Sequence, residues 1–170
     1  MRCILAERNI ERMIKACIFD LDGTLTDTVE SIARGVNRTL EYFGYAPRPV
    51  QEYNFYAGDG IDTAWKKALA AAGDGEGRHY REGIPLCRKW FGENSLYHVR
   101  PYPGIPEAVE QLKQAGVRTA VFSNKPHEAA LRVVHHVFGE NLLTGYRDRP
   151  GRSPKSRIPP ESSGSWNNFP

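Results

Sequence analysis

Residues 17–27 read CIFDLDGTLTD, an apolar run that passes directly into two aspartates, Asp20 and Asp22. The apolar residues predict a strand over 13–19, buried on both faces as strands of a parallel sheet are. Two carboxylates this close raise each other's pKa and cost stability unless a cation or a reaction requires them. The stretch therefore predicts a parallel sheet with a chemical site at the end of its first strand.

The rest of the chain continues this pattern with helices and a second buried strand. That strand is predicted over 117–122, where an apolar run ends in Ser123 and Asn124. Apolar residues at helical spacing predict helices over 29–43, 61–72, 80–91, 106–115 and 127–138. The order strand, helical insert, helix, strand, helix predicts an α/β, doubly wound (Rossmann-like) parallel sheet core with an inserted helical cap.

The same pattern predicts where the parts begin and end. We expect an N-terminal extension over 1–12, a Rossmann-like core over 13–27 and 101–148, and the helical cap over 28–100. A third core strand is expected near 142–143. Residues 149–170 hold five Pro, five Ser and two Gly without any period, so we expect a disordered tail and a core that is incomplete at its C-terminus.

Composition excludes several classes of function. The 170 residues are 40% hydrophobic and 25% charged, as in ordinary globular proteins. The net charge of +3 belongs to residues 147–170, which hold five basic and two acidic residues and leave 18 of each elsewhere. We therefore expect no nucleic acid partner. No run approaches the ~20 apolar residues of a membrane span, and the three scattered cysteines suggest reduced thiols in the cytoplasm. The oligomeric state cannot be read from the sequence.

The ends of the two predicted strands indicate the chemistry. Ligands of open α/β sheets bind at the carboxyl ends of the strands, so Asp20, Asp22 and Ser123 are expected to share one crevice. Mg²⁺ would relieve the repulsion of the paired carboxylates, because hard cations prefer oxygen ligands. An EF-hand calcium loop begins similarly, but Thr24 and Leu25 stand where it needs a ligand and a glycine.

These segments resemble a known family. Residues 20–25, DLDGTL, resemble the first signature of the haloacid dehalogenase-like hydrolases, and residues 121–126, VFSNKP, resemble the second. Residues 26–28, 57–60 and 101–104, which read TDT, AGDG and PYPG, are similar to the phosphoglycolate phosphatase branch. The resemblance covers roughly residues 13–148.

The resemblance implies a phosphomonoesterase that uses Mg²⁺. Asp20 would attack phosphorus and form an aspartyl-phosphate. Asp22 would act as the general acid and base. Mg²⁺ would bind the Asp20 carboxylate and the backbone carbonyl of Asp22. Ser123 and Asn124 would bind the phosphoryl oxygens.

The resemblance also implies the substrate side of the site. The cap would close over the site, with Gly58 and Gly60 in its substrate-facing loop, although a plain helix-entry turn is an equal reading of these glycines. The substrate would be a small phosphorylated metabolite, 2-phosphoglycolate in this branch. Other sugar or acid phosphates, pyrophosphate and mutase activity remain open.

Two family elements are absent from the sequence. The family needs a lysine, often before Pro-Asp-Pro, and a later Gly-Asp segment whose acidic residue completes the Mg²⁺ shell. No Gly-Asp follows Ser123, and Lys155 lies about where the lysine belongs but in another context. Regrouping one possible codon set over 155–159 yields Lys-Pro-Asp-Pro, so we hypothesise a frameshift, with a natural divergent tail as the alternative. We expect impaired activity and folding. A non-catalytic remnant, or a module whose basic tail binds an anionic partner, remains the alternative function.

Overall fold

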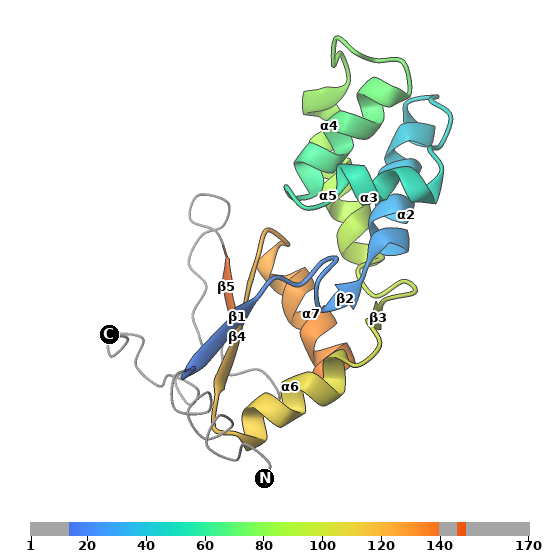
Figure 1. Ribbon diagram of the computed structural model, residues 1–170. Helices are drawn as coiled ribbons and strands as arrows, with labels where there is room; N and C mark the ends of the chain where they lie inside the picture. Colours follow the sequence, from blue (N-terminus) through green and yellow to red (C-terminus); the bar gives the residue numbers. More distant parts are fainter. Residues whose placement is uncertain (1–13, 140–145, 149–170) are drawn as a thin grey trace.

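The central sheet is parallel and places the two polar-ended strands side by side. The computed structural model describes residues 14–139 and 146–148. Strand β1 (Ala16–Phe19) pairs with β4 (Arg118–Ser123), so that Phe19 faces Val121, and β5 (Tyr146–Asp148) pairs with the other edge of β4. Figure 1 shows these three strands together in the lower part of the molecule. The predicted α/β fold with a parallel sheet is confirmed.

Two helices cover one face of this sheet. Helix α6 (Ile105–Gln114) begins with Gly104 at φ 81° and has a proline in its first turn, the position that proline favours. Helix α7 (His127–Phe138) follows β4. Their apolar sides join the sheet in one buried cluster, formed by Leu21, Leu25, Val99, Val109, Val121, Ala130, Val133 and Val134. This cluster anchors the ends of β1 and β4, which lead into Asp20, Asp22 and Ser123.

A short antiparallel ribbon connects the sheet to the helical part of the chain. Strand β2 (Thr26–Asp27) pairs with β3 (Arg100–Pro101), with Thr26 opposite Pro101 and Asp27 opposite Arg100. In Figure 1 the ribbon lies between the sheet and the upper helices. The chain therefore enters the helical part through β2 and leaves it through β3, and these two strands are hydrogen-bonded to each other.

The segment between β2 and β3 is helical and has its own core. It contains α2 (Val29–Tyr42), the 3₁₀ turn η1 (Val50–Glu52), α3 (Tyr53–Tyr56), α4 (Ile61–Ala71) and α5 (Tyr80–Glu93). We call these elements the helical segment. Trp65 and Tyr53, both fully buried, are the largest side chains of its core, and the Trp65 indole N–H donates to the Tyr80 carbonyl. The division into core and cap at these boundaries remains our proposal.

The start of α2 differs from the sequence prediction. In the sequence, Asp27 followed three residues later by Glu30 predicts a capping box at this helix start. Thr28 is the N-cap residue instead, although the Asp27 carboxylate still accepts a 3.3 Å hydrogen bond from the Val29 amide. Glu30 instead pairs with the ring of His98 at 2.7 Å. The capping-box prediction was wrong because the Glu30 carboxylate pairs with His98 rather than with the backbone at the helix start.

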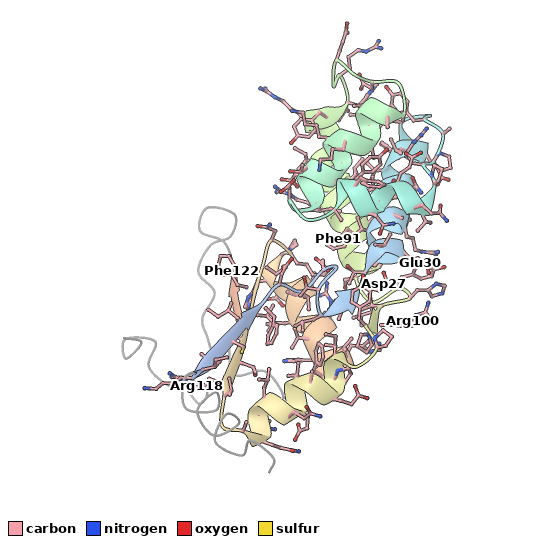
Figure 2. The ribbon with its side chains drawn as sticks, in the orientation of Figure 1. Asp27, Glu30, Phe91, Arg100, Arg118 and Phe122 are labelled. Atoms are coloured by element: carbon pink, nitrogen blue, oxygen red, sulfur yellow. The ribbon has the colours of Figure 1, made fainter. Side chains whose placement is uncertain are left out.

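Helices α2 and α5 approach closely at a glycine. A Cβ added to Gly35 would lie 2.7 Å from the Cα of Phe91, closer than carbon atoms pack. Phe91 is 2% exposed and lies at the lower end of the helical segment, where Figure 2 labels it. Gly35 therefore permits the close approach of α2 and α5.

Several predictions fall on residues that the structure does not describe. The N-terminal extension over 1–12, the tail over 149–170, Lys155 and a strand at 142–143 lie outside the described residues. Across residues 14–139 and 146–148, no helix is both long and apolar enough to cross a membrane. Cys17 and Cys87 are free thiols, and burial raises the pKa of Cys87 to about 12.

Candidate active site

The loop after β1 is held by its apolar residues and its backbone. Leu21 and Leu25 are fully buried, and the amides of Leu25 and Thr26 both donate to the Leu21 carbonyl, at 3.1 and 3.0 Å. Gly23 adopts φ 81°, a conformation that glycine tolerates best, and its amide donates to the Thr26 carbonyl at 2.9 Å. Because Leu21 and Leu25 are anchored inside, Asp20 and Asp22 are left at the open end of the sheet.

The two aspartates have different surroundings. Asp20 is exposed, and its Oδ1 accepts a 2.8 Å hydrogen bond from the Leu21 amide. The side chain of Asp22 is 16% exposed, and its Oδ1 accepts from the Thr28 hydroxyl at 2.7 Å and from Lys125 Nζ at 2.9 Å. Asp20 is thus the accessible carboxylate, while Asp22 is fixed by two donors.

The loop after β4 contributes three consecutive polar residues. Ser123 is 3% exposed, and its Oγ accepts from the Lys125 amide at 3.2 Å, so its own hydroxyl hydrogen can be donated elsewhere. Asn124 donates from Nδ2 to the Gly58 carbonyl at 2.7 Å. Its side chain is therefore directed to the helical segment, and phosphate binding at Asn124 remains a prediction for its backbone.

Lys125 belongs to the site, and sequence reasoning did not assign it. The expected lysine was Lys155, which lies outside the described residues, whereas the side chain of Lys125 is fully buried against Asp22. A usable signal was present, because a lysine two residues beyond a polar strand end must lie near that crevice. The Thr28 hydroxyl was also missed, since Thr28 was considered only as part of the TDT segment at 26–28 and was given no role of its own.

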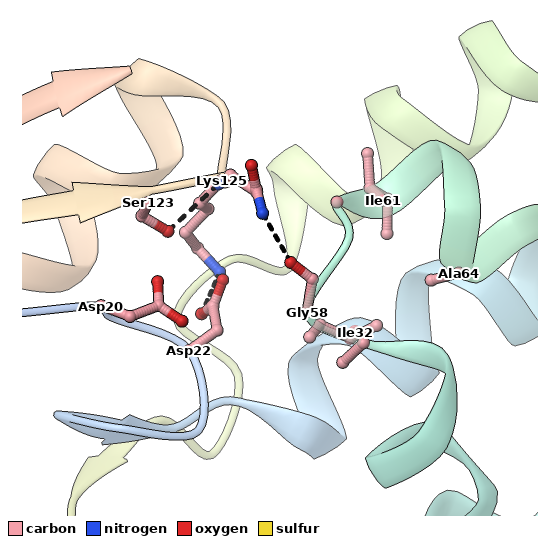
Figure 3. A pocket seen from close by; sticks show the side chains of 11 residues that line it. Asp20, Asp22, Ile32, Gly58, Ile61, Ala64, Ser123 and Lys125 are labelled. Carbon is pink, nitrogen blue, oxygen red and sulfur yellow. Dashed lines mark hydrogen bonds and ion pairs between the residues drawn. The ribbon is translucent and has the colours of Figure 1, made fainter. Parts of the chain in front are cut away.

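Both parts of the molecule line one pocket. It contains roughly 340 Å³ of empty space, including its solvent-filled mouth, and its lining comprises Asp20, Asp22, Ile32, Ala57, Gly58, Gly60, Ile61, Ala64, Ser123, Asn124 and Lys125. Figure 3 shows Asp20, Asp22, Ser123 and Lys125 on the sheet side, opposite Gly58, Ile32, Ile61 and Ala64 on the helical side. The sequence-predicted residues 20, 22, 58, 60, 123 and 124 are all brought together here.

The two glycines of this pocket have backbones suited to glycine. Gly58 adopts φ 102° and Gly60 adopts φ 86°, both in the region that other residues rarely occupy. Gly60 is also the N-cap residue of α4. The loop therefore presents backbone rather than side chains to the polar residues across the pocket.

The donor set of the pocket suits a hard cation only in part. Among the described residues, no group of three His, Cys, Asp or Glu side chains could together hold a metal ion. Mg²⁺ is commonly held by one or two carboxylates and keeps several waters. Asp20, which is exposed in the pocket, fits that pattern together with a backbone carbonyl, whereas Oδ1 of Asp22 is already bound to an ammonium group.

With the pocket described, comparison with known proteins identifies the class. A family model of haloacid dehalogenase-like hydrolases matches residues 14–157. The chain therefore belongs to the haloacid dehalogenase-like hydrolase family.

Curated relatives narrow the comparison within that family. The chain is 31% identical to phosphoglycolate phosphatase of Aquifex aeolicus over 135 residues, which cover 79% of this chain and 59% of the relative. It is 35% identical to phosphoglycolate phosphatase of Nitrosospira multiformis over 114 residues, covering 66% of this chain and 50% of the relative. The chain thus spans about half the length of the curated relatives that it matches.

Solved structures share the fold. A predicted phosphoglycolate phosphatase from Haemophilus somnus superimposes with a TM-score of 0.72 at 24% identity, covering 79% of this chain and 62% of that one. CbbY from Rhodobacter sphaeroides, in complex with phosphate, superimposes with a TM-score of 0.63 at 22% identity, covering 84% and 67%. At these identities the likeness concerns the fold.

Proposed function

We propose that this site belongs to a Mg²⁺-dependent phosphomonoester hydrolase that acts on a small phosphorylated metabolite, with 2-phosphoglycolate as the first candidate. The observation that carries the proposal is the convergence of Asp20, Asp22 and Ser123, from two parallel strand ends, on one pocket. The names of the relatives support the choice of substrate.

The first step uses the different surroundings of the two aspartates. The exposed Asp20 carboxylate attacks phosphorus in line, so that an oxygen–phosphorus bond forms to Asp20 while the bond to the leaving alcohol breaks. Asp22 delivers a proton to the departing oxygen. The Ser123 hydroxyl donates a hydrogen bond to a phosphoryl oxygen, whose charge is spread in the transition state.

The second step restores the enzyme. Asp22 takes a proton from a water molecule, whose oxygen attacks the phosphorus of the aspartyl-phosphate, and the bond to Asp20 breaks to give inorganic phosphate. Mg²⁺, held by the Asp20 carboxylate and the backbone carbonyl of Asp22, would supply charge neutralisation to the transferring group. In the proposed reaction, the Gly58 loop of the helical segment limits the entry of water into the pocket.

The test is release of inorganic phosphate from 2-phosphoglycolate by the full chain, with and without Mg²⁺, beside a panel of sugar phosphates and pyrophosphate. We expect turnover that requires Mg²⁺, is highest on 2-phosphoglycolate and is slow, because the later acidic ligand is not found in the sequence. Faster turnover of another compound would reassign the substrate. Absence of turnover on every compound, with a cooperative melt, would favour the non-catalytic alternative.

A further inference from the structure

Lys125 is a charged group in an unusual position. Its side chain is fully buried, and its ammonium lies 2.9 Å from Oδ1 of Asp22 and 4.6 Å from the centroid of the Phe91 ring. A buried ammonium costs several kcal/mol of desolvation unless close partners compensate. A carboxylate and an aromatic face are both partners of this kind. Lys125 therefore has one partner after β1, Asp22, and one on the helical segment, Phe91.

The contacts of Asp22 show what Lys125 does there. Oδ1 receives hydrogen bonds from Lys125 and from the Thr28 hydroxyl, which approach from the loop after β4 and from the start of α2. The described residues donate no hydrogen bond to the other oxygen, Oδ2. Two donors on one oxygen fix the rotation of the carboxylate and leave Oδ2 available to a substrate.

We propose that Lys125 is a positioning residue for Asp22, whose carboxylate it holds in one orientation. Phe91 belongs to α5 and covers the ammonium from the helical side. The proposal rests on the proposed function, since it assigns Asp22 the transfer of a proton.

The competing role is direct binding of the substrate phosphate by Lys125. The two roles differ in their dependence on Asp22. A residue that acts through Asp22 loses its effect once Asp22 cannot transfer a proton, whereas a phosphate-binding lysine keeps its effect.

The experiment is a double-mutant cycle on the full chain, with p-nitrophenyl phosphate at saturating Mg²⁺. We expect Lys125→Met to lower kcat by about 10²-fold and to change KM by less than about 3-fold. In the Asp22→Asn background, the same substitution should change kcat by less than about 3-fold. Lys113→Met, at an exposed lysine of α6, is the matched control and should leave kcat unchanged.

Equal losses of kcat in both backgrounds, or a higher KM at unchanged kcat, would overturn the proposal. Thermal unfolding provides a readout that does not need activity. Removing one member of a buried pair destabilises more than removing both, so Asp22→Asn with Lys125→Met should melt above Lys125→Met alone. If the unmodified chain releases no phosphate, the proposed function fails, whereas additive melting shifts would contradict the pairing itself.

Discussion

At the scale of single residues, the site depends on apolar side chains placed between polar ones. Leu21 and Leu25 are buried completely, and the Leu21 carbonyl accepts two amide hydrogen bonds. This anchoring leaves Asp20 exposed while Asp22 is held by Thr28 and Lys125. The different surroundings of these two aspartates thus come from their neighbours.

Asp20 and Asp22 should respond differently to substitution. Asp20→Asn should abolish phosphate release, because an amide cannot form the acyl phosphate. Asp22→Asn should slow kcat by about 10²–10⁴, the usual contribution of a general acid and base. Steady-state kinetics on 2-phosphoglycolate measure both, and wild-type rates for Asp20→Asn would refute the assignment.

At the scale of elements, the loop before α4 should control which substrates enter. Gly58 adopts φ 102°, and its carbonyl accepts the Asn124 amide hydrogen bond. Gly58→Ala strains this backbone, so we expect kcat/KM for 2-phosphoglycolate to fall by about 10-fold, with a smaller loss on p-nitrophenyl phosphate. Gly44→Ala is the control, since Gly44 has φ 79° at the end of α2, away from the pocket. Equal losses on both substrates would make the loop merely structural.

The start of α5 depends on a buried carboxylate. Asp74 is 2% exposed and accepts hydrogen bonds from the amides of Arg78 and His79, each at 3.0 Å. The hydrogen bond from the His79 backbone is the main cause that lowers the pKa of Asp74 to about 2. The ionised form therefore stabilises the folded state.

This stabilisation has a defined pH range. Because the pKa is depressed on folding, its contribution is present above the ordinary aspartate pKa of about 4 and is lost as pH falls towards 2. We expect the melting temperature of the unmodified chain to fall as the pH is lowered over this range. The melting temperature of the Asp74→Asn chain should fall less over the same range. Parallel acid melts of the two chains, followed by circular dichroism, measure it. Identical pH slopes would contradict the assignment.

Secondary structure could be read from the sequence where the pattern was long. Helix α7 was expected over 127–138, the range that the structure shows, and apolar runs located β1 and β4. The β2–β3 ribbon was not expected, since two-residue strands carry no periodic pattern and their partners lie far apart in sequence. The start of α2 was misread because Glu30 pairs with His98, a tertiary contact that overrides a local capping signal.

The candidate site was predictable to the extent that its residues follow strands. The polar ends of β1 and β4 meet because parallel neighbours end at the same edge, which the order of elements implied. The place of Lys125 after β4 indicated that it lies near this edge, but its burial beside a carboxylate depends on tertiary packing. The hydrogen bond from Asn124 to the Gly58 carbonyl joins residues that are 66 positions apart in the sequence, and no local pattern encodes that contact.

At the scale of the whole molecule, one face of the sheet presents apolar side chains to solvent. Ile18 on β1 is 63% exposed and Phe122 on β4 is 37% exposed. Both lie on the opposite face from Val121, which packs against α6 and α7, because Ile18 pairs with Ala120 and alternate residues share a face. Exposed apolar surface of this kind favours association between chains.

The full chain is therefore expected to self-associate. Ile18→Thr should reduce association and change the melting temperature by only a few degrees, because the side chain is mostly in solvent already. Light scattering across a range of protein concentrations measures this. The control is Val121→Thr, which alters a residue 1% exposed and should lower the melting temperature much more. A monomeric unmodified chain would contradict the expectation.

The central claim is that Asp20 becomes phosphorylated, and the covalent intermediate is its most direct test. The full chain is incubated with Mg²⁺ and 2-phosphoglycolate, quenched in acid and digested, and its peptides are examined by mass spectrometry. The account predicts an acid-stable, hydroxylamine-sensitive phosphoryl group on the peptide that contains Asp20, and none in the Asp20→Asn chain. Release of phosphate without that modification, or a phosphoryl group on another residue, would contradict it.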